Sequence, residues 1–166
     1  MLTNRFNSNN INLDSNNGDI KSILYRNFTG KPDQFNPKGQ MGNFTIVLDE
    51  DKGHELEAAG LNVKWKDTPD GDKEPRLKIF VRYENFPPHV YRVISGNIKE
   101  LDADSVALLD QDDIQDVDLV ISPYSYEFNG RKGVKAYLSK GYFTIVEDPY
   151  MNKHKDENSD DELPFQ

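Results

Sequence analysis

The chain has 166 residues and a net charge of −9, and 36% of its residues are apolar, so we expect one domain with enough chain to bury a core. It lacks cysteine and has three scattered histidines, which excludes a disulfide framework, a thiolate zinc site and a cysteine nucleophile; we predict no metal and no cofactor. Residues 1–20 lack the apolar run of a secretory signal, and no stretch approaches the roughly 20 apolar residues of a membrane span, so we predict a cytoplasmic protein with no membrane partner.

The first third of the chain passes from an Asn-rich stretch into β-like runs. Residues 1–18 contain seven Asn and only scattered apolar side chains, which predicts a flexible arm. Order is predicted to begin with a strand at Ile20–Phe28, followed by a Gly- and Pro-rich loop and a strand at Asn43–Leu48. A short helix is predicted next, with its cap at Asp49 and its stop at Gly60.

The rest of the chain predicts closely spaced strands and a long hairpin. The strands are expected at Asn62–Lys66, Arg76–Tyr83 and His89–Ile94. The hairpin covers residues 117–146. Its turn begins at Asn129-Gly130, and Gly141 is expected to mark a bulge or bend.

A second helix is predicted over Glu100–Asp113, capped by Asp102 or Asp104. Its inner face is expected to hold Val106, Leu108 and Leu109. The five-stranded oligonucleotide-binding barrel, the OB-fold, has its helix in the corresponding place, between strands three and four.

The predicted fold class is therefore all-β with minor helices, as an OB-fold-like Greek-key barrel with additional strands and a helix. The strand at 20–28 and the helix at 49–60 are the expected additions. We predict an arm at 1–18, a domain at 19–148 and a disordered acidic tail at 149–166.

Charges are sorted along the chain. Residues 147–166 carry a net charge of −5, which leaves −4 for the rest. Residues 100–118 hold eight acids and no base, whereas residues 129–146 hold four bases and no acid. Such a chain has faces of different sign, and a basic face can bind phosphate even on an acidic protein.

The strand at 76–83 combines cations with an aromatic residue. A period of two places Leu77, Ile79, Val81 and Tyr83 on a core face. The opposite face then carries three cations around Phe80. Unpaired bases stack on aromatic rings while phosphates need positive charge, so this surface is typical of a single-strand binder.

Other strands and the basic hairpin turn repeat this combination. The candidate nucleic-acid-binding residues are Lys64, Trp65, Lys66, Arg76, Lys78, Phe80, Arg82, Tyr91, Arg92, Tyr124, Tyr126, Arg131, Lys132, Lys135 and Tyr137. The alternative for several aromatics, Trp65 above all because it shares a face with Val63, is that they belong to the core.

Two other functions stay open at this point. The chain could be an all-β interaction adaptor or a structural phage protein, in which the cations only solvate the surface. A nuclease could use an acidic cluster such as Asp110, Asp112 and Asp113, but no phosphate loop or hydrolase motif occurs, and we predict no enzymatic activity.

The last residues form an acidic stretch with an apolar-Pro-Phe tip: Asp160, Asp161, Glu162, Leu163, Pro164 and Phe165. This ending resembles that of bacterial single-stranded DNA-binding proteins. Here Gln166 follows the Phe, whose own carboxylate pairs with the partner in that family. The resemblance implies a partner-binding tail.

Residues 28–50, 60–66, 83–91 and 120–145 resemble the phage-encoded single-stranded DNA-binding proteins of replication modules. This resemblance implies an OB-fold variant that coats single-stranded DNA during replication or recombination in the host bacterial cytoplasm. It implies replication or recombination proteins as tail partners; a homodimer is left open.

Overall fold

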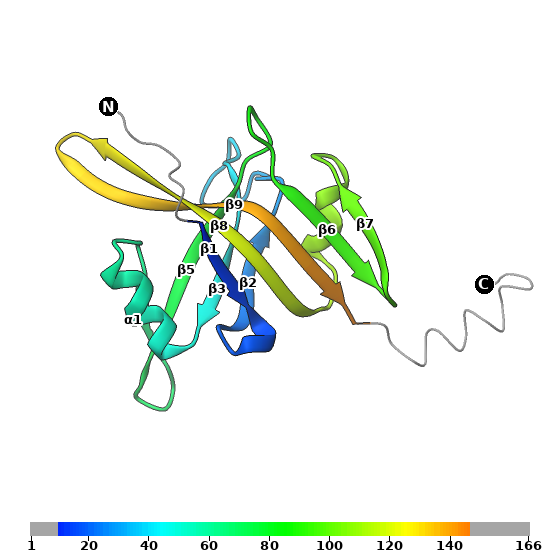
Figure 1. The fold of residues 1–166 in the computed structure, drawn as a ribbon. Coiled ribbons are helices and arrows are strands. Elements are labelled where there is room, and N and C mark those ends of the chain that lie inside the picture. The colour runs from blue at the N-terminus through cyan, green and yellow to red at the C-terminus, as the bar shows by residue number, and fades with distance from the viewer. Residues whose placement is uncertain (1–9, 147–166) are drawn as a thin grey trace, which may run out of the picture.

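The computed structural model describes residues 10–146 and builds them mainly from strands (Figure 1). The elements in chain order are β1 (Ile11–Asp14), the 3-10 helix η1 (Ser15–Asn17), β2 (Ile20–Asn27), β3 (Gly42–Leu48), α1 (Glu50–Ala58), β4 (Lys64–Asp67), β5 (Lys73–Val81), β6 (His89–Ile94), β7 (Asn97–Leu101), the 3-10 helix η2 (Ser105–Asp110), β8 (Ile114–Phe128) and β9 (Arg131–Ile145). The predicted class, mostly β with minor helices, is confirmed.

The strands form one mixed sheet in the order β1-β8-β9-β5-β3-β2, with β4 paired to β5 and β6 paired to both β7 and β9. The pairings of β9 with β5 and β6 are parallel, and the others are antiparallel. The two ends of this path, β1 and β2, are consecutive in the chain and joined through η1. The confirmed part of the fold prediction is the mostly β class, and the OB-fold-like barrel, a partly open five-stranded Greek key, stays a prediction.

The first strand lies earlier than the sequence predicted. β1 falls within the residues expected to be an arm, and its Leu13 is fully buried opposite Leu119 of β8. The prediction that order begins at Ile20 is therefore wrong. So is the prediction that the strand at 20–28 is an addition, because β2 pairs with β3 along the main path of the sheet.

The region around the second predicted helix also differs. β7 occupies Asn97–Leu101, so the helix begins later than predicted, as the 3-10 helix η2. Val106 and Leu109 are fully buried as expected, whereas Leu108 is 48% exposed. A 3-10 helix has three residues per turn, so residues 106 and 109 share a face that residue 108 does not.

The first helix and the hairpin form as the sequence predicts. The Asp49 carboxylate accepts the Asp51 N–H at the start of α1, and the chain leaves the helix through Gly60 at φ +98°. Asn129 and Gly130 form the two-residue turn between β8 and β9, both with positive φ.

A bulge in β9 lies two residues before Gly141. Ile121 pairs with Leu138 and Val120 pairs with Lys140, so Ser139 is the extra residue. The bulge changes the alternation of β9, so that even-numbered side chains are buried before it and odd-numbered ones after it.

The core lies inside the curved sheet around three aromatic rings. Phe28 stacks on Phe44 with ring centroids 4.8 Å apart, and Phe143 meets both rings edge-on at 5.4 and 5.9 Å. These rings come from β3, β9 and the end of β2. In residues 10–146, no helix is long and apolar enough to cross a membrane.

Candidate nucleic-acid interface

The alternation of β5 separates a core face from a binding face. Leu77, Ile79 and Val81 are almost fully buried, whereas Lys78 is exposed and Phe80 is half-buried on the opposite side. This division is the one predicted from the period of two.

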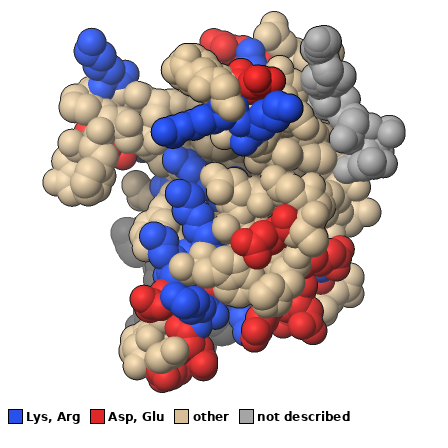
Figure 2. Space-filling view, turned by 90° about the vertical axis from the view of Figure 1, so that its left-hand side faces the viewer, with Lys and Arg blue, Asp and Glu red and all other residues tan. Residues whose placement is uncertain are grey.

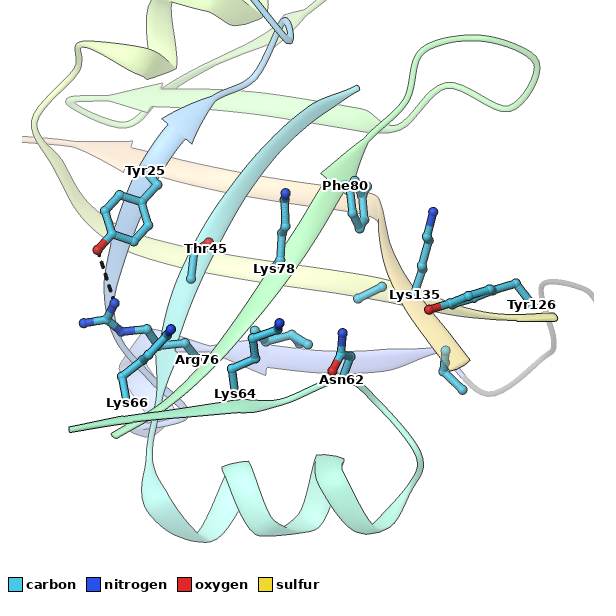
Figure 3. A pocket seen from close by; sticks show the side chains of 13 residues that line it. Tyr25, Thr45, Asn62, Lys64, Lys66, Arg76, Lys78, Phe80, Tyr126 and Lys135 are labelled. Atoms are coloured by element: carbon cyan, nitrogen blue, oxygen red, sulfur yellow. Dashed lines mark hydrogen bonds between the residues drawn. The ribbon is translucent and has the colours of Figure 1, made fainter. Parts of the chain in front are cut away.

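The outward residues of β5 line a groove of about 300 Å³, which we call the basic groove. It is lined by Tyr25, Thr45, Asn62, Lys64, Lys66, Arg76, Leu77, Lys78, Phe80, Tyr126, Val134, Lys135 and Ala136. Figure 3 shows Lys64, Lys66 and Arg76 along one side, Tyr25 at one end, and Phe80 and Tyr126 toward the other. The lining holds five cations and no acid.

Two lysines of the groove lie against aromatic rings. The Nζ atoms of Lys78 and Lys135 are each 5.3 Å from the centroid of Phe80, and Lys135 is equally far from the ring of Tyr126. These distances are typical of cation–π interactions. The interactions position the ammonium groups beside the rings on which a base would stack.

The lysines of the groove keep their charge available. Among residues 10–146, neither Lys64 nor Lys66 forms an ion pair with an acid, and the same holds for Lys78 and Lys135. Each can therefore meet a phosphate without first breaking a salt bridge.

Arg76 differs from the lysines because its guanidinium is already engaged. Its Nη2 and Nε atoms donate to Glu74 at 2.7 and 2.9 Å, and its Nη1 donates to the Tyr25 hydroxyl at 3.2 Å. The hydrogen bond to Glu74 is the main reason that the pKa of Arg76 is raised. Arg76 lies in the groove as predicted, but its contacts hold Tyr25 in place and neutralise Glu74.

Tyr25 is a groove residue that the sequence prediction missed. The register of β2 shifts between Leu24 and Asn27, and this bulge places Tyr25 at φ 52°, a backbone region uncommon for a bulky residue. The side chain is 69% exposed and turned toward Arg76. Nothing in the local sequence marks a bulge at this position.

The aromatic surface continues beyond the groove. The ring of Tyr137 lies 5.8 Å from Phe80 and meets Tyr124 edge-on at 5.9 Å. Burial raises the pKa of Tyr137, and the nearby positive charge of Arg82 partly offsets the shift. The structure thus brings these predicted residues together.

A further aromatic pair follows on β6 and β9. Tyr91 stacks on Tyr142 with ring centroids 4.7 Å apart, and the Nζ atom of Lys140 lies 5.5 Å from the Tyr142 centroid. Tyr91 was predicted from the sequence, whereas Lys140 and Tyr142 were not. The bulge at Ser139 changes the face that these two residues occupy, and a fixed period of two cannot reveal that.

Two predicted residues have other contacts, and we leave them out of the interface. Trp65 packs against α1, where its Nε1 donates to Glu57 at 3.2 Å and its ring lies 4.5 Å from His54. Arg92 donates two hydrogen bonds to the Asp112 carboxylate, at 2.7 and 2.9 Å. Both side chains are committed to packing or to an ion pair.

The remaining predicted cations lie at the tip of the β8–β9 hairpin, which projects from the body of the molecule (Figure 1). Arg131 and Lys132 are exposed there, and Phe128 beside them is 70% exposed. The predicted tail residues, 160–165, lie outside the described residues.

Figure 2 shows Lys and Arg side chains in a run down the middle of this face, with Asp and Glu gathered mainly toward its lower part. In the described part of the chain, no three His, Asp or Glu side chains are placed to hold a metal ion. The site offers positive charge, aromatic rings and an open groove.

Comparisons with known proteins agree with this description. The family model described as a putative phage ssDNA-binding domain matches residues 7–163. The structure of the single-stranded DNA-binding protein from bacteriophage Enc34 in complex with ssDNA is similar, with a TM-score of 0.50 and 16% identity over 85% of this chain and 89% of that one.

A further structure of the Enc34 protein gives a TM-score of 0.50 and 16% identity, over 85% of this chain and 83% of that one. The single-stranded DNA-binding protein gp2.5 of bacteriophage T7 gives 0.38 and 14%, over 95% and 99%. No curated protein matches the chain. At these identities the structural likeness concerns the fold, whereas the family model spans nearly the whole sequence. The chain belongs to the family of putative phage ssDNA-binding domains.

Proposed function

We propose that the chain binds single-stranded DNA without sequence preference and coats it. The observation that carries this proposal is the basic groove, in which five cations and three aromatic side chains line one hollow that no acid enters. A duplex hides its bases, whereas a single strand offers both phosphates and flat base faces to such a groove.

In this proposal, the cations bind phosphates and the aromatic side chains stack on bases. Lys64 and Lys66 of β4 contact phosphates along one side of the groove, and Lys78 joins them from β5. Bases stack on Phe80 and on Tyr126, each contributing roughly 1–3 kcal/mol. Because every base has a π face, this mode of binding tolerates any sequence.

Family membership supports the proposal, and so does the similarity to an Enc34 protein whose structure is described as a complex with ssDNA. We infer that the chain acts in phage DNA replication or recombination in the host cytoplasm, as a binding protein and not as an enzyme. Residues 160–165 recruit replication or recombination partners, as their resemblance to the bacterial tails implies.

The decisive experiment is fluorescence anisotropy of labelled oligo-dT at low salt, followed by a salt titration. We expect binding whose affinity falls steeply with salt, because phosphate contacts release counterions. Failure to bind at low salt would end the proposal. The labelled strand should also stay intact in the presence of Mg²⁺, since cleavage would indicate a nuclease.

A charge-reversal variant separates the proposal from an interaction adaptor. Lys78→Glu combined with Arg82→Glu reverses two charges on the binding face while leaving the core face of β5 unchanged. If the chain coats DNA, this variant should no longer bind single-stranded DNA. If the chain is an adaptor that uses other surfaces, the variant should still bind its protein partners.

A further inference from the structure

A second hollow, of about 470 Å³, adjoins the basic groove. It is lined by Arg82, Glu84, Asn85, Phe86, Pro87, His89, Ser122, Tyr124, Tyr137, Leu138 and Ser139. These residues come from the loop between β5 and β6, from the start of β6, and from β8 and β9. The hollow is larger than the basic groove and is not needed to explain binding there.

A series of neighbouring aromatic rings leads from the basic groove to the second hollow. Phe80 lines the first and Tyr137 lines the second, and their ring centroids are 5.8 Å apart. Tyr124 follows at 5.9 Å from Tyr137. A single strand that stacks a base on Phe80 therefore meets another aromatic surface directly beyond it.

An apolar side chain at the rim of the second hollow is exposed to solvent. Phe86 is 82% exposed, so the fold gains little from its burial. Asn85 before it has φ 70°, and Pro87 and Pro88 after it restrict the backbone further. A loop held in one shape loses less conformational freedom when its aromatic residue meets a ligand.

The second hollow has fewer positive charges than the basic groove. The positive charge of Arg82 acts on Tyr137, which links the two hollows, and Glu84 is the one acid among the described residues that line the second hollow. We therefore expect the strongest phosphate contacts in the basic groove and at Arg82. Contacts in the second hollow fall mainly to the aromatic rings.

We propose that the second hollow is a nucleotide subsite that takes the bases of the same single strand after it passes Phe80, with Phe86 stacking on one of them. This inference rests on the proposed function. It assigns to Phe86 a role that affects only strands long enough to occupy both hollows.

The test is a series of oligo-dT lengths, from about 4 to about 16 nucleotides, the range of site sizes of such barrels. The shortest strands occupy the basic groove, which holds most of the cations. We expect Phe86→Ala to leave their affinity unchanged and to weaken the longer strands by at least about fivefold, the smallest effect of losing one stacked base. Phe86→Trp should retain binding of the longer strands, and Phe86→Leu should not.

Phe35→Ala is the matched control. Phe35 is 80% exposed in the loop between β2 and β3, and it lines neither hollow. We expect it to bind every length like the wild type. Three results would overturn the second subsite: an equal loss of affinity in both variants, a loss that is the same at all strand lengths, or no loss from Phe86→Ala. In each case, binding by the wild type would still support the basic groove. Failure of the wild type to bind any length would overturn the proposed function itself.

Discussion

The ring of Tyr126 lies over Gly133, its partner across the β8–β9 hairpin. A Cβ atom at Gly133 would come within 2.5 Å of the Tyr126 hydroxyl oxygen and within 2.6 Å of the ring. The glycine thus leaves space in which the ring lies flat beside Lys135. The hairpin positions one wall of the basic groove through this pair.

Gly133→Ala should displace the Tyr126 ring and weaken single-strand binding. The clash involves the far end of a side chain, so the ring can swing away while the hairpin stays folded. We expect a loss of up to roughly 1–3 kcal/mol of binding free energy, the worth of one stacked base, measured by anisotropy with oligo-dT. The midpoint of thermal unfolding should change little.

A double-mutant cycle checks that Gly133 acts through Tyr126. If it does, Gly133→Ala adds nothing to the loss caused by Tyr126→Ala. Additive losses would mean that the substitution disturbs the groove by another route.

The salt dependence of binding should distinguish Lys64 from Arg76. Lys64→Gln removes a phosphate contact, so the slope of log affinity against log salt should become shallower by about 0.7. The paired change Arg76→Gln with Glu74→Gln removes an existing ion pair without altering the net charge, and it should leave the slope near the wild-type value. A shallower slope in the paired variant would show that Arg76 contacts phosphate directly.

Trp65 and Phe80 should affect different properties of the protein. Trp65→Ala removes packing against α1, so it should lower the free energy of unfolding by roughly 1–3 kcal/mol and leave oligo-dT affinity unchanged. Phe80→Ala should weaken binding by roughly 1–3 kcal/mol and alter stability less. Urea denaturation and anisotropy measure the two effects, and a loss of affinity in Trp65→Ala would return that residue to the interface.

The sequence predicted the parts of the site that depend on local periodicity. The alternation of β5 places Lys78 and Phe80 on one face whatever the neighbouring strands are, and the Asn129-Gly130 pair identifies the hairpin turn by its backbone requirement. The helix over 49–60 carries its cap and its stop in the sequence. Each of these signals lies within a few residues of the element that it predicts.

The features that were missed depend on distant pairings or on bulges. β1 is a strand because it pairs with β8, more than a hundred residues later, and its Asn-rich composition gives no sign of this. Tyr25 and Lys140 occupy the binding side only because a bulge changes the alternation of β2 or β9. Period-two patterning cannot place a side chain beyond an unseen bulge.

Low pH should reduce the stability of the folded protein, partly through protonation of Asp102. One oxygen of this carboxylate accepts hydrogen bonds from the Asp104 N–H at 3.0 Å and from the N–H and hydroxyl of Ser105 at 2.8 and 2.9 Å. The bonds from Ser105 are the main reason that the pKa of Asp102 lies below its ordinary value of 3.8. Its contribution to stability is therefore complete above that value and is lost as the pH falls through the lower folded pKa.

Asp102→Ala should remove this part of the acid sensitivity. The melting temperature of the variant should be lower than that of the wild type at neutral pH, and the difference should shrink as the pH falls below 3.8. Asp104→Ala is the control, because the Asp104 side chain makes no capping hydrogen bond at η2. A difference that stays constant with pH would show that the loss comes from something other than the carboxylate charge.

Removing residues 156–166 should tighten single-strand binding and abolish partner recruitment. The segment carries five acids, which we expect to compete with phosphate for the lysines of the basic groove, so the gain in affinity should be largest at low salt, where screening is weakest. Phe165→Ala keeps those charges and should reduce recruitment alone, as measured by pull-down of replication proteins with oligo-dT affinity followed in parallel. Pro164 restricts the backbone before Phe165, which lowers the entropy lost when the ring enters an apolar pocket. If truncation weakens DNA binding or changes neither property, the acidic end neither competes with DNA nor recruits partners, and the groove alone accounts for what the protein does.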